Sequence, residues 1–498
     1  MTILLKILGL NCAAIRAFFY LAVVKRYIIQ LALTSLTVLV SIDVMGQVDS
    51  LPFAISAEKR LSDAKLGRKK EGFNVAAIPR FAYDPIQGVG LGVDAELFNN
   101  GRRDDPFFAY TPYRQRYQLS LWAAQNGKVA GSLRVDMPYV FDTRWRFRAR
   151  FSFADNPNKL YFGIGESTLA NLDPPFWDDY AAELNRALPG NPVFGEDPNL
   201  LYTDRRFHYL AYRKFALDLI MERSYLEGRL RIIGAVGFTS LAYRHYDGEP
   251  IEDATDSEGR SVTAINRSTR ITQDAFDTEG SWDRFNVTGY EGGFSSKLKF
   301  GIIYDTRDFE PDPYKGFLVE YGMGLTHPLI GSDFQYQRHM LQYLQFIPLF
   351  TYGEKGYQSN LALRSAFSVI AGPDLFFREV YDVWSASQGR IGLLGGEDNL
   401  RGYKKFRFAA PVYGFGSLEW RTQLTDFEFL NQNWMISAVP FFDYGRVWDE
   451  IPAMNLRDFK YNWGLGARIH WNQNTIIRLD YAISQEDRQF FLIFGQMF

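Results

Sequence analysis

The side chains that most often carry catalysis or bind metals are few in this chain and widely scattered. It has one cysteine, Cys12, in its 498 residues. The five histidines lie far apart, at His208, His245, His327, His339 and His470. Their spacing does not match the ligands of one metal ion, and a lone cysteine near the start excludes a disulfide scaffold and a cysteine nucleophile downstream. We therefore predict that the chain is not an enzyme and binds no metal and no cofactor.

Three other groups could in principle do chemistry. Asp305, Arg307 and Asp308 could form a metal or acid–base site, but a proline and a glycine follow, so a charged turn is the preferred interpretation. The glycines of 88–92 lie on a predicted strand with no helix after it, which excludes a nucleotide-binding loop. The acidic segment 249–259 could bind calcium, although a solvated loop is the simpler interpretation.

The overall charge gives no reason to expect a nucleic-acid partner. There are 55 Lys and Arg residues against 57 Asp and Glu residues, a formal net charge of −2. Aromatic residues make up 16% of the chain, with 42 Phe and 29 Tyr. After residue 47 no apolar run approaches the length of a membrane-spanning helix.

Alternation with a period of two residues dominates the chain instead. In the segment 144–153 one face carries four arginines and a serine, and the other carries Trp145, Phe147, Ala149, Phe151 and Phe153. In a soluble sandwich the apolar face would be the core. The same pattern recurs around 297–305, 462–471 and 477–483. Repeated strands with one polar and one apolar, aromatic-rich face are typical of a transmembrane β-barrel.

About sixteen such segments can be counted, an even number, as a closed bacterial barrel requires. They are 74–83, 87–98, 115–125, 128–138, 144–154, 206–223, 229–245, 295–306, 316–326, 333–350, 357–371, 412–424, 434–448, 460–471, 475–484 and 489–498. The three longest connections, 155–205, 246–294 and 372–411, all fall on one side, the predicted outer face. The connection 99–114 is the exception, because it is long and on the inner side. The predicted fold is an all-β antiparallel barrel.

Three parts are expected along the chain. Residues 1–46 read as a signal peptide with cleavage after Gly46, although two apolar runs leave open a start at Val24 or a membrane anchor. Residues 47–73 form a short periplasmic segment, either a flexible tail or a short helix that docks on the barrel rim. Residues 74–498 form the outer-membrane barrel.

Three motifs together suggest a family. They are Leu394-Gly-Gly-Glu-Asp-Asn-Leu-Arg-Gly-Tyr403, Phe441-Phe-Asp-Tyr-Gly-Arg-Val-Trp448 and Tyr304-Asp-Thr-Arg-Asp308. With the C-terminal strand, they resemble the bacterial surface antigen family, the BamA/TamA-like outer-membrane assembly superfamily. The resemblance covers residues 290–498 well and 74–290 only in strand pattern. It implies that the long loop folds back into the barrel lumen.

The resemblance also implies the residues of a lumen site. Charges on the strands must face the lumen, because lipid disfavours a midplane Arg or Lys by about 2–4 kcal/mol. Carried over, Arg401 would pair with Asp443 and Glu419, Gly402 would let the loop tip bend, and Tyr403 would pack the tip against the wall. Whether such a site only holds a plug in place or also moves is left open by the sequence.

The first and last strands must pair to close the barrel. Pro79 removes a hydrogen-bond donor from the first strand, and Gly495 predicts a kink in the last. The resemblance implies a seam that opens sideways and templates an incoming strand, although many barrels carry such residues without opening. The last residues also resemble a barrel-assembly signal, with an outward face of Phe490, Leu492, Phe494 and Phe498.

The expected function is to aid insertion or translocation of proteins at the outer membrane of a Gram-negative bacterium. A passive pore and a structural surface barrel remain as alternatives. The expected partners are outer-membrane lipid and unfolded or surface-bound client proteins. The 27 residues between the signal and the first strand cannot build a POTRA domain, so we expect the POTRA-less branch, with a periplasmic or lipoprotein partner.

Overall fold

The computed structural model describes residues 51–494, apart from 62–65, 67–68, 85, 173–184, 187–200, 204–205, 256–260, 267, 309, 311, 390, 430–431 and 472–474. The chain divides into two compact units, Met1–Asp49 and Ser50–Phe498. The predicted signal peptide, Gly495 and Phe498 therefore lie outside the described residues. Among the residues described, no helix is both long and apolar enough to cross a bilayer.

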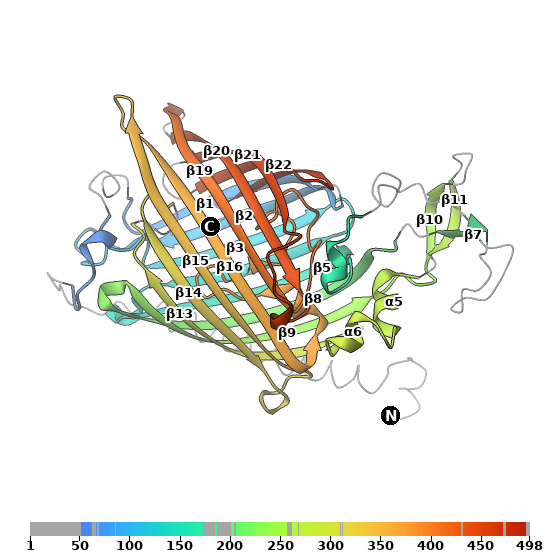
Figure 1. Ribbon diagram of the computed structural model, residues 1–498. Coiled ribbons are helices and arrows are strands. Elements are labelled where there is room, and N and C mark those ends of the chain that lie inside the picture. Colours follow the sequence, from blue (N-terminus) through green and yellow to red (C-terminus); the bar gives the residue numbers. More distant parts are fainter. Residues whose placement is uncertain are drawn as a thin grey trace, which may run out of the picture. The chain divides into compact units, whose positions relative to one another are not determined.

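Sixteen long strands form one large sheet (Figure 1). They are β1 (Phe73–Asp84), β2 (Gly88–Asn99), β3 (Gln115–Ala124), β4 (Val129–Met137), β5 (Trp145–Leu160), β8 (Tyr209–Tyr225), β9 (Leu230–Arg244), β13 (Gly292–Asp305), β14 (Gly316–Thr326), β15 (Gln335–Tyr352), β16 (Tyr357–Phe376), β19 (Val412–Phe429), β20 (Gln432–Trp448), β21 (Lys460–Trp471), β22 (Thr475–Ile483) and β23 (Arg488–Phe494). They coincide closely with the segments expected from alternation.

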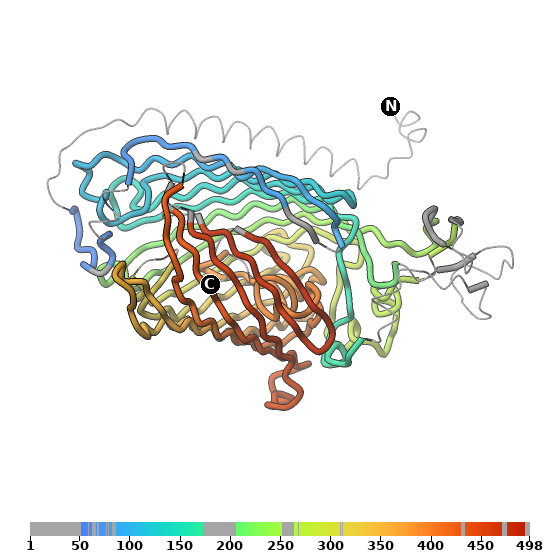
Figure 2. The backbone as a smooth tube through the Cα atoms, turned by 90° about the horizontal axis from the view of Figure 1, so that it is seen from above, coloured from blue at the N-terminus to red at the C-terminus, as the bar shows by residue number. Residues whose placement is uncertain are grey.

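Each strand pairs antiparallel with the next strand of this series, from β1 to β23. The last strand, β23, lies against β1, so that the sheet curves round to its own beginning (Figures 1 and 2). The prediction of an all-β antiparallel barrel is confirmed. One short parallel strand, β12 (Val287–Thr288), also joins the sheet beside β16, which the period-two pattern could not reveal.

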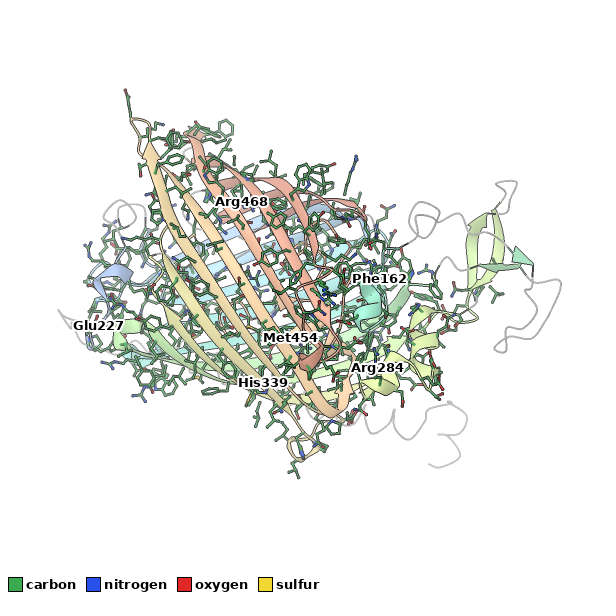
Figure 3. The ribbon with its side chains drawn as sticks, viewed as in Figure 1. Phe162, Glu227, Arg284, His339, Met454 and Arg468 are labelled. Atoms are coloured by element: carbon green, nitrogen blue, oxygen red, sulfur yellow. The ribbon has the colours of Figure 1, made fainter. Side chains whose placement is uncertain are left out.

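Polarity is inverted relative to a soluble protein. On β21 the outward Trp463 and Leu465 are 58% and 60% exposed, while the inward Asn462 and Arg468 are 0% and 1% exposed. Figure 3 labels Arg468 on this strand. Large buried charges and exposed aromatic rings are the reverse of what water selects, and they are what a lipid-facing barrel requires.

The two ends of the barrel differ. The long-loop rim carries the connections 161–208, 245–291 and 377–411, and the short-turn rim carries the tight turns. Figure 3 places Glu227, in a turn, at one end, and Phe162 and Arg284, in long connections, at the other. The long connections hold the elements η3 (Glu166–Leu169), β6 (Asn185–Arg186), β7 (Leu201–Thr203), β10 (Pro250–Thr255), β11 (Ser261–Asn266), α5 (Arg270–Phe276) and α6 (Ser281–Arg284). The acidic segment 249–259 includes β10 and partly lies outside the described residues.

The N-terminal segment meets the short-turn rim. It contains a short helix, η1 (Ala57–Lys59), and the Ser56 amide donates to the Glu227 carbonyl at 2.9 Å. The Leu61 amide donates to the Ala109 carbonyl at 2.8 Å. The connection 100–114, which appeared too long for an inner turn, folds together with this segment, and Phe53 and Phe107 pack 5.5 Å apart. The extra length therefore builds a cap on the rim.

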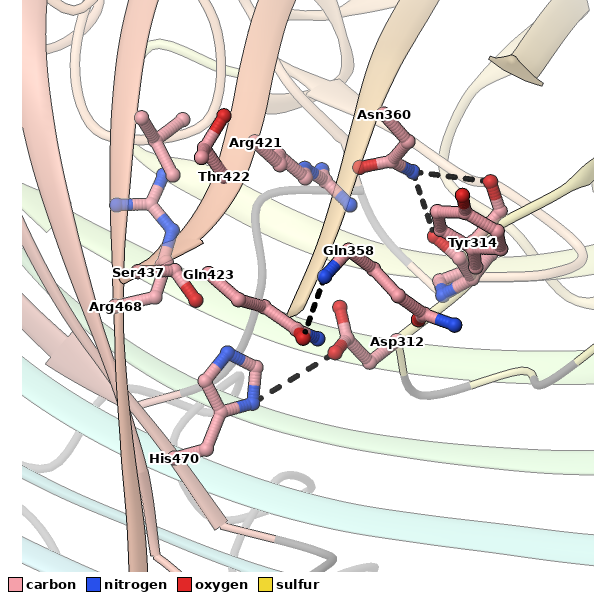
Figure 4. Close-up of a pocket in the computed structure, with 12 residues that line it drawn as sticks. Asp312, Tyr314, Gln358, Asn360, Arg421, Thr422, Gln423, Ser437, Arg468 and His470 are labelled. Carbon is pink, nitrogen blue, oxygen red and sulfur yellow. Dashed lines mark hydrogen bonds and ion pairs between the residues drawn. The ribbon is translucent and has the colours of Figure 1, made fainter. Parts of the chain in front are cut away.

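The connection 306–315 also departs from a simple turn. Its Glu310 approaches Arg146 on β5 and Arg231 on β9, each at 3.7 Å. Further along, the amide of Asn360 on β16 donates to the carbonyls of Pro313 and Tyr314, and Asp312 lies 3.7 Å from His470 on β21 (Figure 4). This connection therefore bridges strands from distant parts of the sheet, across the lumen.

Candidate functional site: the lumen plug and its buried ion pairs

The connection between β16 and β19, residues 377–411, folds back into the barrel and is called the plug here. It contains α7 (Phe377–Val380) and a small antiparallel pair, β17 (Asp382–Val383) with β18 (Ile391–Gly392). One hydrophobic cluster includes twelve buried side chains of the plug, and Phe406 is partly buried against it. The twelve are Phe377, Val380, Tyr381, Val383, Ile391, Leu393, Leu394, Leu400, Tyr403, Phe408, Ala409 and Ala410. The plug is therefore a packed element of the lumen.

Arg401 is fully buried, with 0% of its side chain exposed, and it contacts the barrel wall on three strands. Its Nε and Nη2 donate to the two carboxylate oxygens of Asp443 on β20, at 2.9 and 2.8 Å. Its Nη1 donates to Glu419 on β19 at 2.8 Å and to Asp480 on β22 at 3.1 Å. Its guanidinium also lies 3.4 Å from the ring centroid of Phe441. The structure thus brings together all the residues expected at this site.

Asp480 and two arginines complete the site, and we did not assign them to it from the sequence. Arg468 on β21 donates to Asp480 at 2.6 Å and to Glu419 at 3.3 Å, and Arg421 donates to Glu419 at 2.9 Å. The alternation in the sequence places Asp480 on the polar face of its strand. This alternation is the signal from which Asp480 could have been assigned to the site. Its role depends on barrel curvature, which brings β22 to face the plug.

The electrostatics of the site favour the charged form of Arg401. Burial alone would lower the pKa of its guanidinium, but Asp443, Glu419 and Asp480 outweigh burial and raise the pKa above its usual value. The three carboxylates have no access to water to replace the arginine. A buried pair of this kind is costly to break, because the group left behind is an unpaired charge. The site therefore holds a loop against the barrel wall.

Gly402 lies in a tight turn, in which the Tyr403 amide donates to the Leu400 carbonyl at 3.1 Å, and it also lies close to the barrel wall. A Cβ on this residue would lie 2.6 Å from the Asn462 Cβ and 3.0 Å from the Ser484 Cβ. Glycine is thus required by the close approach of the plug to β21, and not by a left-handed backbone. Tyr403 is 1% exposed, its hydroxyl donates to the Tyr461 carbonyl at 3.3 Å, and its ring lies 5.1 Å from that of Phe408.

Replacing Gly402 with alanine is expected to displace the tip of the plug from β21, since neither neighbouring Cβ can retreat without moving its strand. The expected result is at least a severalfold faster protease cleavage within 394–408 in the folded barrel. Gly392→Ala is the matched control, because this plug glycine does not have a left-handed backbone and a Cβ there would make only an ordinary contact, 3.9 Å from Asp398 Oδ2. Equal cleavage of the two variants would contradict the close-approach explanation.

A second buried carboxylate anchors the plug on the other side of the lumen. Glu320 on β14 is fully buried and accepts hydrogen bonds from the Ala386 amide, the Ser387 amide at 3.2 Å and the Ser385 hydroxyl at 3.2 Å. Near the other end of the plug, Arg407 binds Glu486 and the carbonyls of Thr168 and Ala170. The plug is consequently held by charged groups at several points, most of which carry no recognisable motif.

The plug also packs against the long connections. Phe377 lies 5.5 Å from the ring of Tyr161 and 5.0 Å from that of Trp282. In the same region His208 and Tyr161 bind each other, with 2.9 Å between the ring Nδ1 and the Tyr161 carbonyl and 2.8 Å between the Tyr161 amide and the His208 carbonyl. Burial lowers the pKa of His208 to about 4, helped by Arg270 and Arg407, although the Tyr161 carbonyl opposes the shift.

Acidification is therefore expected to loosen this junction. His208 is neutral in the folded state and has a pKa near 6.5 when unfolded, so the unfolded state binds more protons between pH 6.5 and pH 4. The stability is present above pH 6.5 and is lost as the pH falls toward 4. We expect protection from hydrogen exchange at 159–163 and 207–210, corrected for intrinsic rates, to fall about tenfold from pH 7.5 to pH 5.

The control for this prediction is His208→Gln, which cannot titrate. Its hydrogen-exchange protection should be lower at pH 7.5 and should change little on acidification. A wild-type protein whose protection at this junction is the same at both pH values would contradict the assignment of the pH effect to His208.

The seam between β1 and β23 is the other place singled out by the sequence. Pro79 lies on β1 opposite Val93 of β2, and Phe490 and Leu492 lie opposite Tyr481 and Leu479 of β22. Within the described part of the two strands, no backbone pairing joins β1 to β23. Large apolar side chains of β1, Phe73, Val75 and Phe81, are 66%, 75% and 58% exposed.

The strand pattern, the inverted polarity and the plug define a class, the transmembrane β-barrel with a loop folded into its lumen. Residues 212–498 match the Omp85 superfamily domain, and residues 51–114 match a domain of unknown function, DUF5982. The chain belongs to the Omp85 superfamily, which contains the BamA-like proteins that its motifs resemble. As a member of this superfamily of outer-membrane proteins it is not an enzyme, as predicted. No curated protein matches the sequence significantly.

Solved structures with similar folds have low identity to this chain. BamA from Haemophilus ducreyi lacking POTRA domains 1–3 is 13% identical, with a TM-score of 0.46, and the match covers 86% of this chain and 70% of that one. CdiB from Escherichia coli is 9% identical, with a TM-score of 0.45 and coverage of 85% and 60%. CdiB from Acinetobacter baumannii is 8% identical, with a TM-score of 0.42 and coverage of 84% and 58%. The family assignment therefore depends on the domain match.

Proposed function

We propose that this protein aids the insertion or translocation of other proteins at the outer membrane of a Gram-negative bacterium. The observation that carries the proposal is a difference in backbone pairing between the seam of β1 and β23 and the other neighbouring strands of the barrel. Fifteen neighbouring strand pairs are joined by backbone ladders, three of them with a register shift, whereas no ladder joins the described parts of β1 and β23. An unpaired strand edge is a template for an incoming strand, and Pro79 keeps a gap in the donors of β1. The clients are unfolded or surface-bound proteins, with a periplasmic or lipoprotein partner.

The plug argues against a passive pore. The lumen is crossed by residues 377–411, with Arg401 fully buried between three carboxylates, and by the connection 306–315. Diffusion of a solute through the lumen would require both the plug and the connection 306–315 to move out of it. The sideways route through the seam requires neither, because β1 and β23 both lie outside the Arg401 contacts. In this proposal Phe490, Leu492 and Phe494 of β23, together with Phe498 outside the described residues, serve as the signal for the barrel's own assembly.

The test is depletion of the protein, followed by quantitative profiling of outer-membrane and surface proteins and of their rates of synthesis. We expect a defined set of barrels or surface lipoproteins to decrease while their synthesis continues, and to recover when the wild-type chain is restored. An unchanged profile would refute the proposal. In that case solute uptake and single-channel conductance test the pore, and surface-binding assays test the structural role.

A further inference from the structure

A cavity of about 490 Å³ lies in the lumen between the cap on the short-turn rim and the plug. Its wall is formed by strands from β2 to β9, one end is closed by residues around Lys59, Tyr113 and Glu310, and the other by Ser387–Gly389 of the plug. This volume is in the range of sites that hold small organic ligands. None of the residues of the Arg401 site lines it, so it is a separate feature.

The described lining is strongly basic. Nine Lys or Arg side chains face six Asp or Glu side chains: Lys59, Arg116, Arg134, Arg144, Arg146, Arg148, Arg150, Arg231 and Arg307, against Glu96, Asp136, Glu222, Asp305, Asp308 and Glu310. The carboxylates already have cationic or amide partners. Arg146 binds Asp136 with two hydrogen bonds, at 2.7 and 2.5 Å, and Arg148 binds Glu222 at 3.0 Å. The described lining therefore carries three more cationic than carboxylate side chains.

The surplus is centred on one cross-strand row. Arg134 on β4 stands directly opposite Arg150 on β5, a like-charge pair that opposes strand pairing. The carboxylates at the two ends of this row, Glu96 and Asp218, are bound by Arg116 and Lys299. Within the described part of the chain, the Arg134 guanidinium has no ion-pair or hydrogen-bond partner, and it is exposed to the cavity. Arg144 likewise has no ion pair there, and stacks on Phe53 of the cap, 5.3 Å from its ring centroid.

We infer that this cavity binds an oxyanion of the phosphate class, with Arg134 as its central ligand and Arg150, directly opposite on β5, as a second. Guanidinium groups donate two parallel hydrogen bonds to phosphate oxygens, which lysine does not do equally well. A bound polyanion would offset the Arg134–Arg150 repulsion that the strands otherwise carry. The volume and the cationic lining suit a small phosphorylated molecule or a single lipid headgroup.

The experiment measures binding of inorganic pyrophosphate to the purified, folded barrel in phosphate-free detergent solution by calorimetry. We expect binding by the wild type, and affinity at least about tenfold weaker for Arg134→Gln and for Arg150→Gln, since each removes charge-assisted hydrogen bonds. Arg213→Gln is the matched control, because Arg213 pairs with Asp155 outside the cavity at 2.8 Å. Heat-modifiable migration on a gel verifies that each variant is folded, and either cavity variant suffices if the other misfolds.

A second arm separates the two sources of phosphate. The same titration is repeated in phosphatidylcholine nanodiscs with and without phosphatidic acid. Loss of pyrophosphate binding only when phosphatidic acid is present identifies a lipid headgroup, and unchanged binding identifies a free phosphorylated molecule; both support the site. Absence of pyrophosphate and phosphatidic acid binding by the wild type would overturn the inference. Binding that survives equally in both cavity variants would also overturn it.

Discussion

Replacing Arg401 with alanine is expected to lower the free energy of unfolding by about 3–5 kcal/mol, the cost of breaking a buried ion pair by removing one partner. The variant leaves Asp443, Glu419 and Asp480 without the cation that binds all three. Arg468 and Arg421 still neutralise part of this charge, but neither contacts Asp443. The plug loses its contacts with the wall around β20 and becomes accessible from the long-loop rim.

The measurement is the midpoint temperature of heat-modifiable migration, together with protease cleavage of 394–408 and single-channel conductance. Arg401→Lys keeps the charge and loses the two-point contact with Asp443, so an intermediate midpoint is expected. Arg213→Ala removes an exposed pair and should change stability by about 0–1 kcal/mol. An Arg401→Ala barrel with the midpoint of the wild type and an uncleaved plug would show that packing alone holds the plug.

Replacing Phe377 with alanine, at the base of the plug, is expected to cause the second large loss of stability. The ring is fully buried and packs on Tyr161, Tyr243, Trp282 and Tyr381. Deleting a buried phenylalanine removes its transfer free energy and leaves a cavity, a loss of about 3–5 kcal/mol. Because Tyr161, Trp282 and Tyr381 come from three long connections and Tyr243 from the end of β9, the whole long-loop rim is expected to loosen.

This effect is measured by hydrogen exchange of 161–172, 281–290 and 377–383, with the same thermal midpoint as a global readout. Leu329→Ala is the control, since Leu329 is 90% exposed and its loss should be neutral. Arg401→Ala should leave exchange at 281–290 nearly unchanged, whereas Phe377→Ala should raise it. If the two variants gave the same exchange pattern, the plug and the long-loop rim would be one cooperative unit.

Much of this fold could be predicted, because the side chains of a barrel strand alternate between the lipid and the lumen and their polarity alternates with them. The expected strand 460–471 agrees with β21 (Lys460–Trp471), and 316–326 with β14 (Gly316–Thr326). The ends differ where a strand leaves the lipid region. There β16 and β19 continue by about five residues beyond the expected ends, since alternation fades while the backbone ladder continues.

The site was only partly predictable, for a geometric reason. The loop motif predicts Arg401, and the alternation of the strands predicts which residues face the lumen. Only closure of the barrel determines which of these polar residues contact one another. Asp480 and Glu320 are ordinary polar-face residues in the sequence, and they become plug contacts because β22 and β14 face the lumen from different sides. The sequence predicts only a charged turn in the connection 306–315. Its contacts with β5 and β21 also depend on closure of the barrel.

The cap on the short-turn rim has a consequence for the order of folding. Lys59 donates to the carbonyl of Arg307, 248 residues further along the chain, and Ser56 accepts from Arg229, 173 residues away. Contacts this distant in sequence cannot form until both β9 and β13 are in place, and their loop-closure entropy makes them slow. The cap is therefore among the first segments to be synthesised and among the last to reach its native contacts. Until then the lumen stays open to the compartment from which the chain arrives.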